Sequence, residues 1–428
     1  MAEARAVACH PVEEARWTVE RFAFMERRCM EVLAAWVWTT GELETKLTFG
    51  AHAYEDAVQS ELFRDRGGEL RPSLPTYGWD ARPPGLAQLD AIFRELAGAP
   101  TLAAKLGGLY GALKPWLVTA YDDYLAAADP ILEGPTVRLL EQALLDERRQ
   151  VAWARARLDD LERMQPDAPA DAERWRGRVL HLLNEAVTAL TSDEASRAPL
   201  ADFAGTQPAV DPRFDLIYYT PGVGSSREFE IDPLNETEVR KVMLSTLTAV
   251  ETEAAELLGR ILVEFPELPW EMRRRLARQM WDECRHAASQ WRLLEEIGGY
   301  LGCYPSIVYI NLFAGDEPDV FKRLIVLQRV VEGSSVDQHR PRGRYFLDQG
   351  AIPLVHMFDY ILADEDGHIA LSRWTNQLVG ADQGRLDELA RYQARKEQEF
   401  AEYSDWIVSK RRDLQRLFQP AAARSARA

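Results

Sequence analysis

The segment DECRH at residues 282–286 decides the fold, and its pattern returns as DEDGH at residues 364–368. In both segments an Asp precedes a Glu, and a His follows that Glu by three positions. On a helix, residues three apart lie on one face about one turn from each other, so both side chains can reach the same metal ion. The repeated Glu-x-x-His pattern therefore predicts a metal site built from at least two helices.

The repetition makes this signal specific. With 7 His in the chain, one Glu-x-x-His is expected by chance roughly once in two chains of this size. Two copies, each preceded by Asp and each in the middle of a predicted helix, are expected roughly once in a thousand chains. We therefore interpret the pair as a functional signature.

The chain around the two motifs has the pattern of an all-α protein. Apolar residues recur at three- and four-residue spacing, which predicts helices over 236–265, 270–298, 316–341 and 352–379. Prolines turn the first pair of helices into a hairpin, about eighteen residues form a crossover, and a second hairpin follows. This order predicts a four-helix bundle with each motif in the second helix of its hairpin. We expect no substantial sheet, and one short strand near 216–219.

The chain divides into four parts. Residues 1–200 are also helical and form an N-terminal domain, whereas Pro and Gly interrupt every candidate helix over 201–235, which indicates a linker or an extended strap. Residues 236–418 are the predicted dimetal domain, in which an extra helix over 387–417 packs outside the bundle. Residues 419–428 are predicted to be a disordered tail.

Two further glutamates are needed to complete a site for two ions, one from each remaining helix. In an antiparallel hairpin, residues at equal distance from the turn lie level with each other, and Glu251 and Glu283 are centred on residue 267, inside the turn. Glu251 is therefore our candidate, with Glu256 as the alternative. On the third helix the inward-facing acid is Glu332, which precedes Glu365 by 33 positions.

The predicted ligands, which are also the candidate catalytic residues, are Glu251, Glu283, His286, Glu332, Glu365 and His368. Four carboxylates with one imidazole per ion suit iron or manganese better than copper or zinc. Asp282 and Asp364 are expected to accept hydrogen bonds from the distal N–H groups of the ligand histidines. His339 lies two turns beyond Glu332, roughly 10 Å along the helix axis, so we expect it to be structural.

With these motifs, residues 236–380 resemble the ferritin-like diiron carboxylate superfamily. They look most like a group of bacterial ferritin-like proteins in which two D-E-x-x-H motifs are paired. The resemblance implies a ferritin-like four-helix bundle, two iron ions, and reaction with dioxygen or peroxide. The ligand types suit a manganese/iron pair equally well, and neither the ligands nor the resemblance identifies an organic substrate.

A related segment, DERRQ at residues 146–150, has Gln150 in place of the motif histidine. We interpret the N-terminal domain as a degenerate ferritin-like bundle that arose by duplication, with a plain helical domain as the alternative. No Glu stands about 32 positions before Glu147, where Pro115 lies, so we predict no metal in this domain. Its candidate roles are formation of a homodimer and covering the mouth of the C-terminal bundle.

The leading functional hypothesis is a dinuclear non-haem iron oxygenase or oxidase that uses dioxygen to oxidise a small organic substrate, with Glu251 and Glu332 bridging the ions. One alternative is a ferroxidase or a rubrerythrin-like peroxide scavenger, which needs an external electron donor because the chain has no C-x-x-C pair. The other is a non-catalytic helical scaffold with a structural metal, which apolar packing could replace at a lower desolvation cost.

Composition argues against several other classes of protein. A net charge of -17 over 428 residues, without a long run of Lys or Arg, makes nucleic acid an unfavourable partner. The chain has only 4 cysteines, and none are paired at C-x-x-C spacing. This predicts a reducing cytoplasmic location rather than a disulfide framework. The N-terminus lacks an apolar signal segment, and no stretch approaches the ~20 apolar residues of a membrane span, so we expect neither secretion nor membrane insertion.

Overall fold

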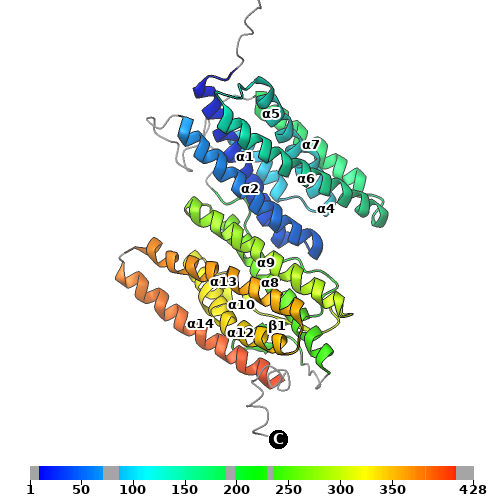
Figure 1. Ribbon diagram of the computed structural model, residues 1–428, viewed down its shortest axis with the longest axis vertical. Helices are drawn as coiled ribbons and strands as arrows, with labels where there is room; N and C mark the ends of the chain where they lie inside the picture. The colour runs from blue at the N-terminus through cyan, green and yellow to red at the C-terminus, as the bar shows by residue number, and fades with distance from the viewer. Residues whose placement is uncertain (1–8, 71–85, 189–197, 229–234, 381, 411–428) are drawn as a thin grey trace, which may run out of the picture. The chain divides into compact units, whose positions relative to one another are not determined.

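In the computed structural model, the described residues are 9–70, 86–188, 198–228, 235–380 and 382–410. They are predominantly helical, which confirms the predicted all-α class, and the predicted tail at 419–428 lies outside them. The chain forms two compact units (Figure 1). The first consists of residues 1–36, 51–202 and 262–270, and the second of residues 37–50, 203–261 and 271–428.

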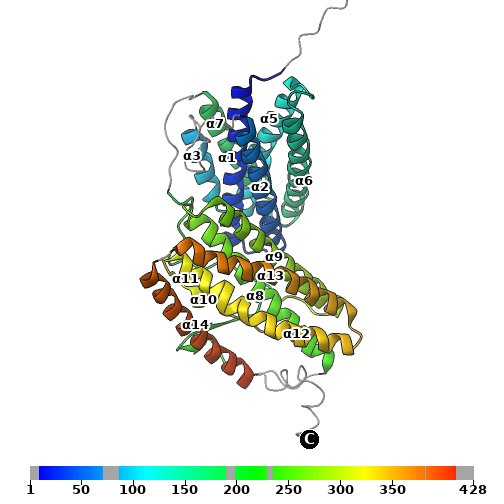
Figure 2. The same ribbon diagram turned by 60° about the vertical axis from the view of Figure 1, so that its left-hand side comes forward.

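Long helices run alongside one another in the first unit (Figures 1 and 2). In chain order the elements are α1 (Val12–Thr39), α2 (Leu43–Leu70), α3 (Leu86–Ala97), α4 (Leu102–Lys105), η1 (Leu106–Leu113), α5 (Lys114–Ala127), α6 (Gly134–Met164) and α7 (Ala168–Thr188). The segment η1 is a π-helix that joins α4 to α5 without a break, so one widened turn directly precedes Lys114.

Four long helices of the second unit carry the predicted ligands: α8 (Glu236–Glu264), α9 (Trp270–Glu296), α12 (Glu332–Asp348) and α13 (Ile352–Val379). The ends of α8, α9 and α13 agree with the predicted ends within two residues. Asn235 caps α8 as its sequence pattern predicts, because its Oδ1 accepts a hydrogen bond from the Glu238 N–H at 3.1 Å. The extra helix, α14 (Gln383–Lys410), packs against the segments that precede α12.

The third predicted helix is less regular than its sequence pattern suggests. It consists of α11 (Val320–Ile325), the π-helix η2 (Val326–Val331) and α12, preceded by the short helix α10 (Ile310–Ala314). Asp319, rather than Asp316, caps it by accepting from the Phe321 N–H at 3.0 Å. The helix also continues past Pro341, because this proline is exposed and water can hydrate the carbonyl group that loses its N–H partner.

An apolar cluster at one end of the site holds the four ligand-bearing helices together. Its members include Leu244 of α8, Leu294 of α9, Phe346 of α12 and Phe358 of α13, all fully buried. The rings of Phe346 and Phe358 stack with centroids 6.0 Å apart. Each such side chain contributes about 1.5–3 kcal/mol by leaving water, so this cluster fixes the spacing at which the ligand side chains meet.

A small sheet anchors the segment that precedes α8. Strand β1 (Leu216–Thr220) pairs in parallel with β3 (Ser306–Val308) and antiparallel with β2 (Gly224–Ser225). The predicted short strand is therefore present, and it ties the strap at 201–235 to the crossover between the hairpins. Residues 229–234 of that strap lie outside the described residues. Among the described helices, none combines the length and apolar character needed to cross a membrane.

Candidate metal centre

The structure brings the six predicted ligand residues together in the second unit, and all six are buried. Two groups of three could each hold an ion, because within each group one donor atom per residue lies within 4.8 Å of the other two. The groups are Glu251, Glu283 and His286, and Glu283, Glu332 and His368. Since Glu283 belongs to both, this geometry favours Glu283 as the bridge instead of Glu251 and Glu332, which belong to one group each.

Both histidines turn Nδ1 toward the carboxylates. His286 Nδ1 lies 3.3 Å from Glu283 Oε2 and 3.9 Å from Glu251 Oε2. His368 Nδ1 lies 3.4 Å from Glu365 Oε2 and 3.5 Å from Glu283 Oε1. Glu365 thus sits beside His368 although it is outside the two groups, so Nδ1 is the nitrogen that would bind an ion in both motifs.

Several of these buried donor atoms lack a hydrogen-bond partner among the described residues: Glu283 Oε2, His286 Nδ1, Glu365 Oε2 and His368 Nδ1. Buried polar atoms without partners are rare in folded proteins because each costs free energy. Two divalent cations would give these atoms partners and would balance the charge of four carboxylates. The donor set therefore fits a dinuclear centre of hard cations.

The two aspartates that precede the motif glutamates lie behind the histidines. His286 Nε2 is 3.1 Å from Asp364 Oδ2, and His368 Nε2 is 3.5 Å from Asp282 Oδ2. Each aspartate therefore contacts the histidine of the other motif rather than that of its own. An aspartate in this position leaves the proton on Nε2 and frees Nδ1 for a metal ion.

Two arginines of α9 hold these aspartates in place, and the sequence analysis did not assign them a role. Arg278 Nε donates to both carboxylate oxygens of Asp282 at 2.8 and 2.9 Å, and Arg285 Nη2 donates to Asp364 Oδ2 at 2.8 Å. Burial alone would raise the pKa of Asp364, but the hydrogen bond from His286 and the charge of Arg285 lower it to about 2. Arg278 stands four residues before Asp282 and Arg285 three residues after it, and this helical spacing could have predicted both ion pairs with Asp282 from the sequence.

Glutamine side chains complete the surroundings of the carboxylates. Gln290, one turn after His286, donates to Glu251 Oε1 at 3.0 Å and is a contact that the sequence analysis missed. Gln279 Nε2 lies 3.3 Å from both Glu283 Oε1 and Glu332 Oε1, and Gln328 of η2 donates to Gln279 at 3.2 Å. These amides orient the carboxylates, and the bond from Gln290 leaves Glu251 Oε2, the oxygen nearer His286, accessible.

The alternative ligand Glu256 lies outside the cluster. It forms a buried ion pair with Lys46 and accepts a hydrogen bond from Asn311 Nδ2 at 3.3 Å. Its neighbour Glu253 accepts hydrogen bonds from the N–H groups of Tyr309 and Ile310 at 2.7 and 3.0 Å, at the start of α10. Both acids therefore have structural partners, and Glu251 is the residue of α8 that reaches the site.

Without cations, burial and crowding raise the pKa of two of the carboxylates and of both imidazoles. Burial and the neighbouring Glu332 raise the pKa of Glu283 to about 8, and burial and Glu365 raise the pKa of Glu332 well above its usual range. Burial lowers the pKa of the two histidines, but the surrounding carboxylates outweigh it and raise the pKa of both well above 6.5. Metal ions would have to displace the protons of these groups.

A cavity of about 490 Å³ opens against the candidate ligands Glu251, Glu332 and Glu365. Its walls come from α8, α12, the start of α10 and α14, so the extra helix borders the cavity as well as packing outside the bundle. Cavities of 300–1,000 Å³ are typical of sites for small organic ligands. The arrangement thus combines a cluster of metal ligands with space for a molecule beside it.

The model of one protein family, protein of unknown function (DUF455), matches residues 178–414, more than half of the chain. The chain belongs to this family. The match to DUF455 covers all six predicted ligands, both aspartates and the cavity, and its description assigns no activity. Comparison with curated proteins found no match, and comparison with solved structures found none either.

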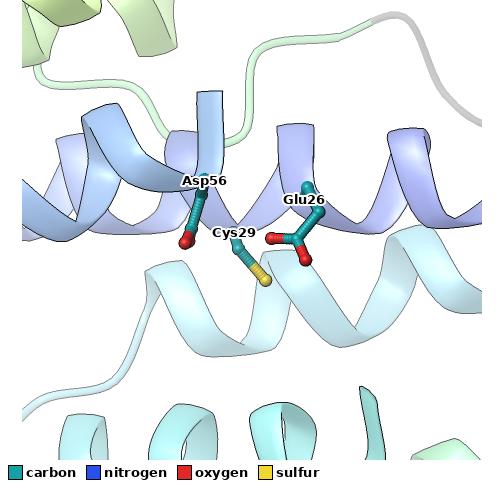
Figure 3. Close-up of side chains that lie close together, drawn as sticks. All are labelled: Glu26, Cys29 and Asp56. Carbon is teal, nitrogen blue, oxygen red and sulfur yellow. The ribbon is translucent and has the colours of Figure 1, made fainter. Parts of the chain in front are cut away.

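A second group of candidate ligands lies in the first unit, before the residues matched by DUF455. The side chains of Glu26 and Cys29 on α1 and Asp56 on α2 point toward one another (Figure 3). A lysine already supplies the positive charge there, because Lys114 Nζ donates to Asp56 Oδ1 at 3.1 Å and to Glu147 Oε1 at 2.6 Å. Burial raises the pKa of the Cys29 thiol well above 9, which disfavours the thiolate that a metal ion needs.

We predict that Asp364→Asn lowers metal affinity about 10- to 100-fold without unfolding the protein, because His286 loses the partner that orients it. Equilibrium titration with Mn(II) measures the change. Asp366→Asn is the matched control, since Asp366 is an exposed acid two residues away on the same helix. Equal affinities for the two variants would contradict the role given to Asp364.

Metal affinity is also predicted to rise with pH. In metal-free protein Glu283, Glu332 and both histidines hold protons near neutral pH, because their pKa values are raised. Below the pKa of a group, its proton has to leave before a metal ion can bind. Each such proton therefore lowers the apparent Kd about tenfold for every pH unit by which the pH rises. Titration with Mn(II) at pH 6, 7 and 8, followed by the spin resonance of free ion, tests this; an affinity independent of pH would contradict it.

In the first unit, Lys114→Met is predicted to destabilise the protein by about 3–5 kcal/mol, because Asp56 and Glu147 are left buried without their cation. Chemical denaturation followed by circular dichroism measures this loss. The neutral variant Lys114→Met/Asp56→Asn/Glu147→Gln should recover part of it. A loss below about 1 kcal/mol for the single variant would argue against the lysine's role.

Proposed function

We propose that this protein is a ferritin-like dinuclear non-haem iron enzyme, with two iron ions or a manganese/iron pair, that oxidises a small organic substrate with dioxygen. The observation that carries the proposal is the convergence of four buried glutamates and two histidines whose inward-facing atoms include several without partners. When bound, such a pair of ions binds and reduces dioxygen. Electrons would come from the substrate or from an external donor.

The chain's own residues would prepare the site for this chemistry. Glu283 belongs to both groups of donors, and the remaining candidate ligands come from α8, α9, α12 and α13. Asp364 would keep the proton of His286 on Nε2, Asp282 lies 3.5 Å from His368 Nε2, and Gln279 and Gln290 fix carboxylate orientation by donating N–H groups. Held in this way, the ligands need little reorganisation when charge at the centre changes.

The cavity favours oxidation of an organic molecule over ferroxidase or peroxide-scavenging activity. Iron ions and peroxide need only a narrow path, whereas about 490 Å³ of space borders three of the ligands. The walls are partly apolar, with Leu247 and Val250 from α8 and Phe400 and Ile407 from α14. A purely structural metal is disfavoured by the same cavity, because a structural site has no need of an open side.

We propose also that the first unit is a second, degenerate copy of the same bundle. Lys114 follows the π-helix η1 and precedes Glu147 by 33 positions, as Glu332 follows η2 and precedes Glu365 by 33 positions. Gln59 takes the place of a ligand histidine, three positions after Asp56. The ammonium group of Lys114 would thus replace the metal charge.

The polar contacts behind the two centres correspond as well. Gln59 Nε2 donates to Asp146 Oδ2 at 2.9 Å, as His286 Nε2 contacts Asp364 Oδ2 at 3.1 Å. Gln150 Nε2 donates to Glu55 Oε2 at 3.0 Å, which corresponds to the contact between His368 and Asp282. In both units, the motif side chain of each helix contacts the acid that precedes the motif of the other helix. This shared pattern supports duplication more strongly than the single segment at 146–150 does.

Stoichiometry of iron oxidation separates the proposed enzyme from a ferroxidase. Protein loaded without oxygen with about two Fe(II) per chain is predicted to consume dioxygen on mixing, with oxidation limited to the bound iron. With a large excess of Fe(II), consumption should stop at the same amount. Continued oxidation of the excess, measured with an oxygen electrode and a chelator of Fe(II), would favour the ferroxidase instead.

A further inference from the structure

The cavity beside the proposed metal centre has two chemically different ends. Glu251, Glu332 and Glu365 border it at the centre, and Gln338 and Arg342 of α12 border it elsewhere. The Arg342 guanidinium contacts His339, which stands seven positions after Glu332 on one continuous helix, so the guanidinium lies roughly 10 Å beyond Glu332 along the axis. A ligand that reached both ends would therefore be an extended molecule.

Arg342 has only neutral side chains as hydrogen-bond partners among the described residues. Its Nη2 donates to Gln338 Oε1 at 3.0 Å, and its Nη1 lies 3.3 Å from His339 Nδ1. Burial lowers the pKa of Arg342 to about 10, so the guanidinium keeps its charge at neutral pH. Arg342 is partly buried beside the cavity, and guanidinium groups at such sites are commonly paired with an anion.

His339 supports Arg342 without competing for an anion. Burial and the nearby Arg342 lower the pKa of His339 to about 3, so the imidazole is neutral and accepts a hydrogen bond through Nδ1. Its ring packs against Phe358 with centroids 5.2 Å apart, which fixes its orientation. Arg342 is therefore the one positively charged side chain among the described residues that line the cavity.

The walls between the two ends are mainly apolar. Met243 and Leu247 of α8 face the cavity, as do Phe400, Tyr403 and Ile407 of α14. Such a wall removes an aliphatic or aromatic body from water, at about 25 cal/mol per Å² of apolar surface. The chemistry of the cavity thus matches a molecule with one anionic end and an apolar body.

We propose that the cavity binds an amphipathic organic carboxylate, with its carboxylate on Arg342 and its apolar body directed toward Glu251 and Glu332. A single planar guanidinium matches a carboxylate, which it can bind through two parallel hydrogen bonds. A phosphate dianion carries two negative charges and would need more positive charge than one arginine supplies. The role of this molecule as the substrate rests on the proposed function, whereas its binding does not.

Calorimetric titration of the full chain with decanoate tests the binding. Because bonds to charged groups are strong, wild-type protein is predicted to bind decanoate at least tenfold more tightly than decan-1-ol, and Arg342→Gln should remove this preference. Arg342→Lys should keep part of it, which shows that the site is folded. Arg344→Gln is the matched control, since Arg344 is exposed on the same helix.

Three results would overturn the inference: equal binding of decanoate and decanol, unchanged binding by Arg342→Gln, or tighter binding of decyl phosphate than of decanoate. Titrations of chelator-treated protein separate this inference from the proposed function, because the anion site needs no metal. With Mn(II) added, proton relaxation should be faster at the methyl end of decanoate than beside its carboxylate. Faster relaxation beside the carboxylate would contradict the proposed orientation.

Discussion

A carboxylate inside a helical protein needs a positive charge nearby, and this requirement governs the interior of both units. Desolvation of an isolated carboxylate costs several kcal/mol, so a buried group either takes a proton or obtains a cation. In the first unit Lys114 is that cation, held between Asp56 and Glu147. In the second unit the four candidate glutamates lie against His286 and His368, and the proposed metal ions would supply the further positive charge.

The same requirement explains the layers around the proposed centre. Arg278 and Arg285 balance Asp282 and Asp364, which in turn face the two histidines. The glutamates are therefore surrounded first by the two histidines, then by the two aspartates, and then by arginines that are partly accessible to water. Lys46 does the same for Glu256, away from the centre. Asp282, Asp364 and Glu256 thus each have a cationic partner, and metal ions are our proposal for the glutamates of the candidate site.

Much of this arrangement could be predicted from the sequence because helix periodicity and ligand spacing are local properties. The two D-E-x-x-H segments predicted four candidate ligands and both aspartates, and counting from the turn predicted Glu251; the structure brings these residues together. Other features depend on tertiary contacts that local spacing does not encode. The π-helix before Glu332, the continuation of α12 through the exposed Pro341, and the crossed pairing of each aspartate with the other motif's histidine belong to this class.

The surroundings of Arg342 and His339 could not be predicted by counting residues along a helix. The distance of His339 from Glu332 excluded it as a ligand to the same ion, and its neutral imidazole against Arg342 agrees with that exclusion. Sequence alone could not show that both residues lie beside a cavity, because α14 supplies a wall from a part of the chain about sixty residues away. Likewise, the equal spacing of Lys114 from Glu147 and of Glu332 from Glu365 is informative only when the two units are compared.

Metal content per chain is the most direct test of this account, measured by mass spectrometry on protein expressed with added iron. About two ions, as iron or as iron plus manganese, are predicted for wild type and for Glu147→Gln in the first unit. Glu283→Ala/His368→Ala should contain none while keeping its helical circular dichroism. Folded wild-type protein without metal, or equal metal in the double variant, would contradict the central claim that the buried glutamates of the second unit hold two ions.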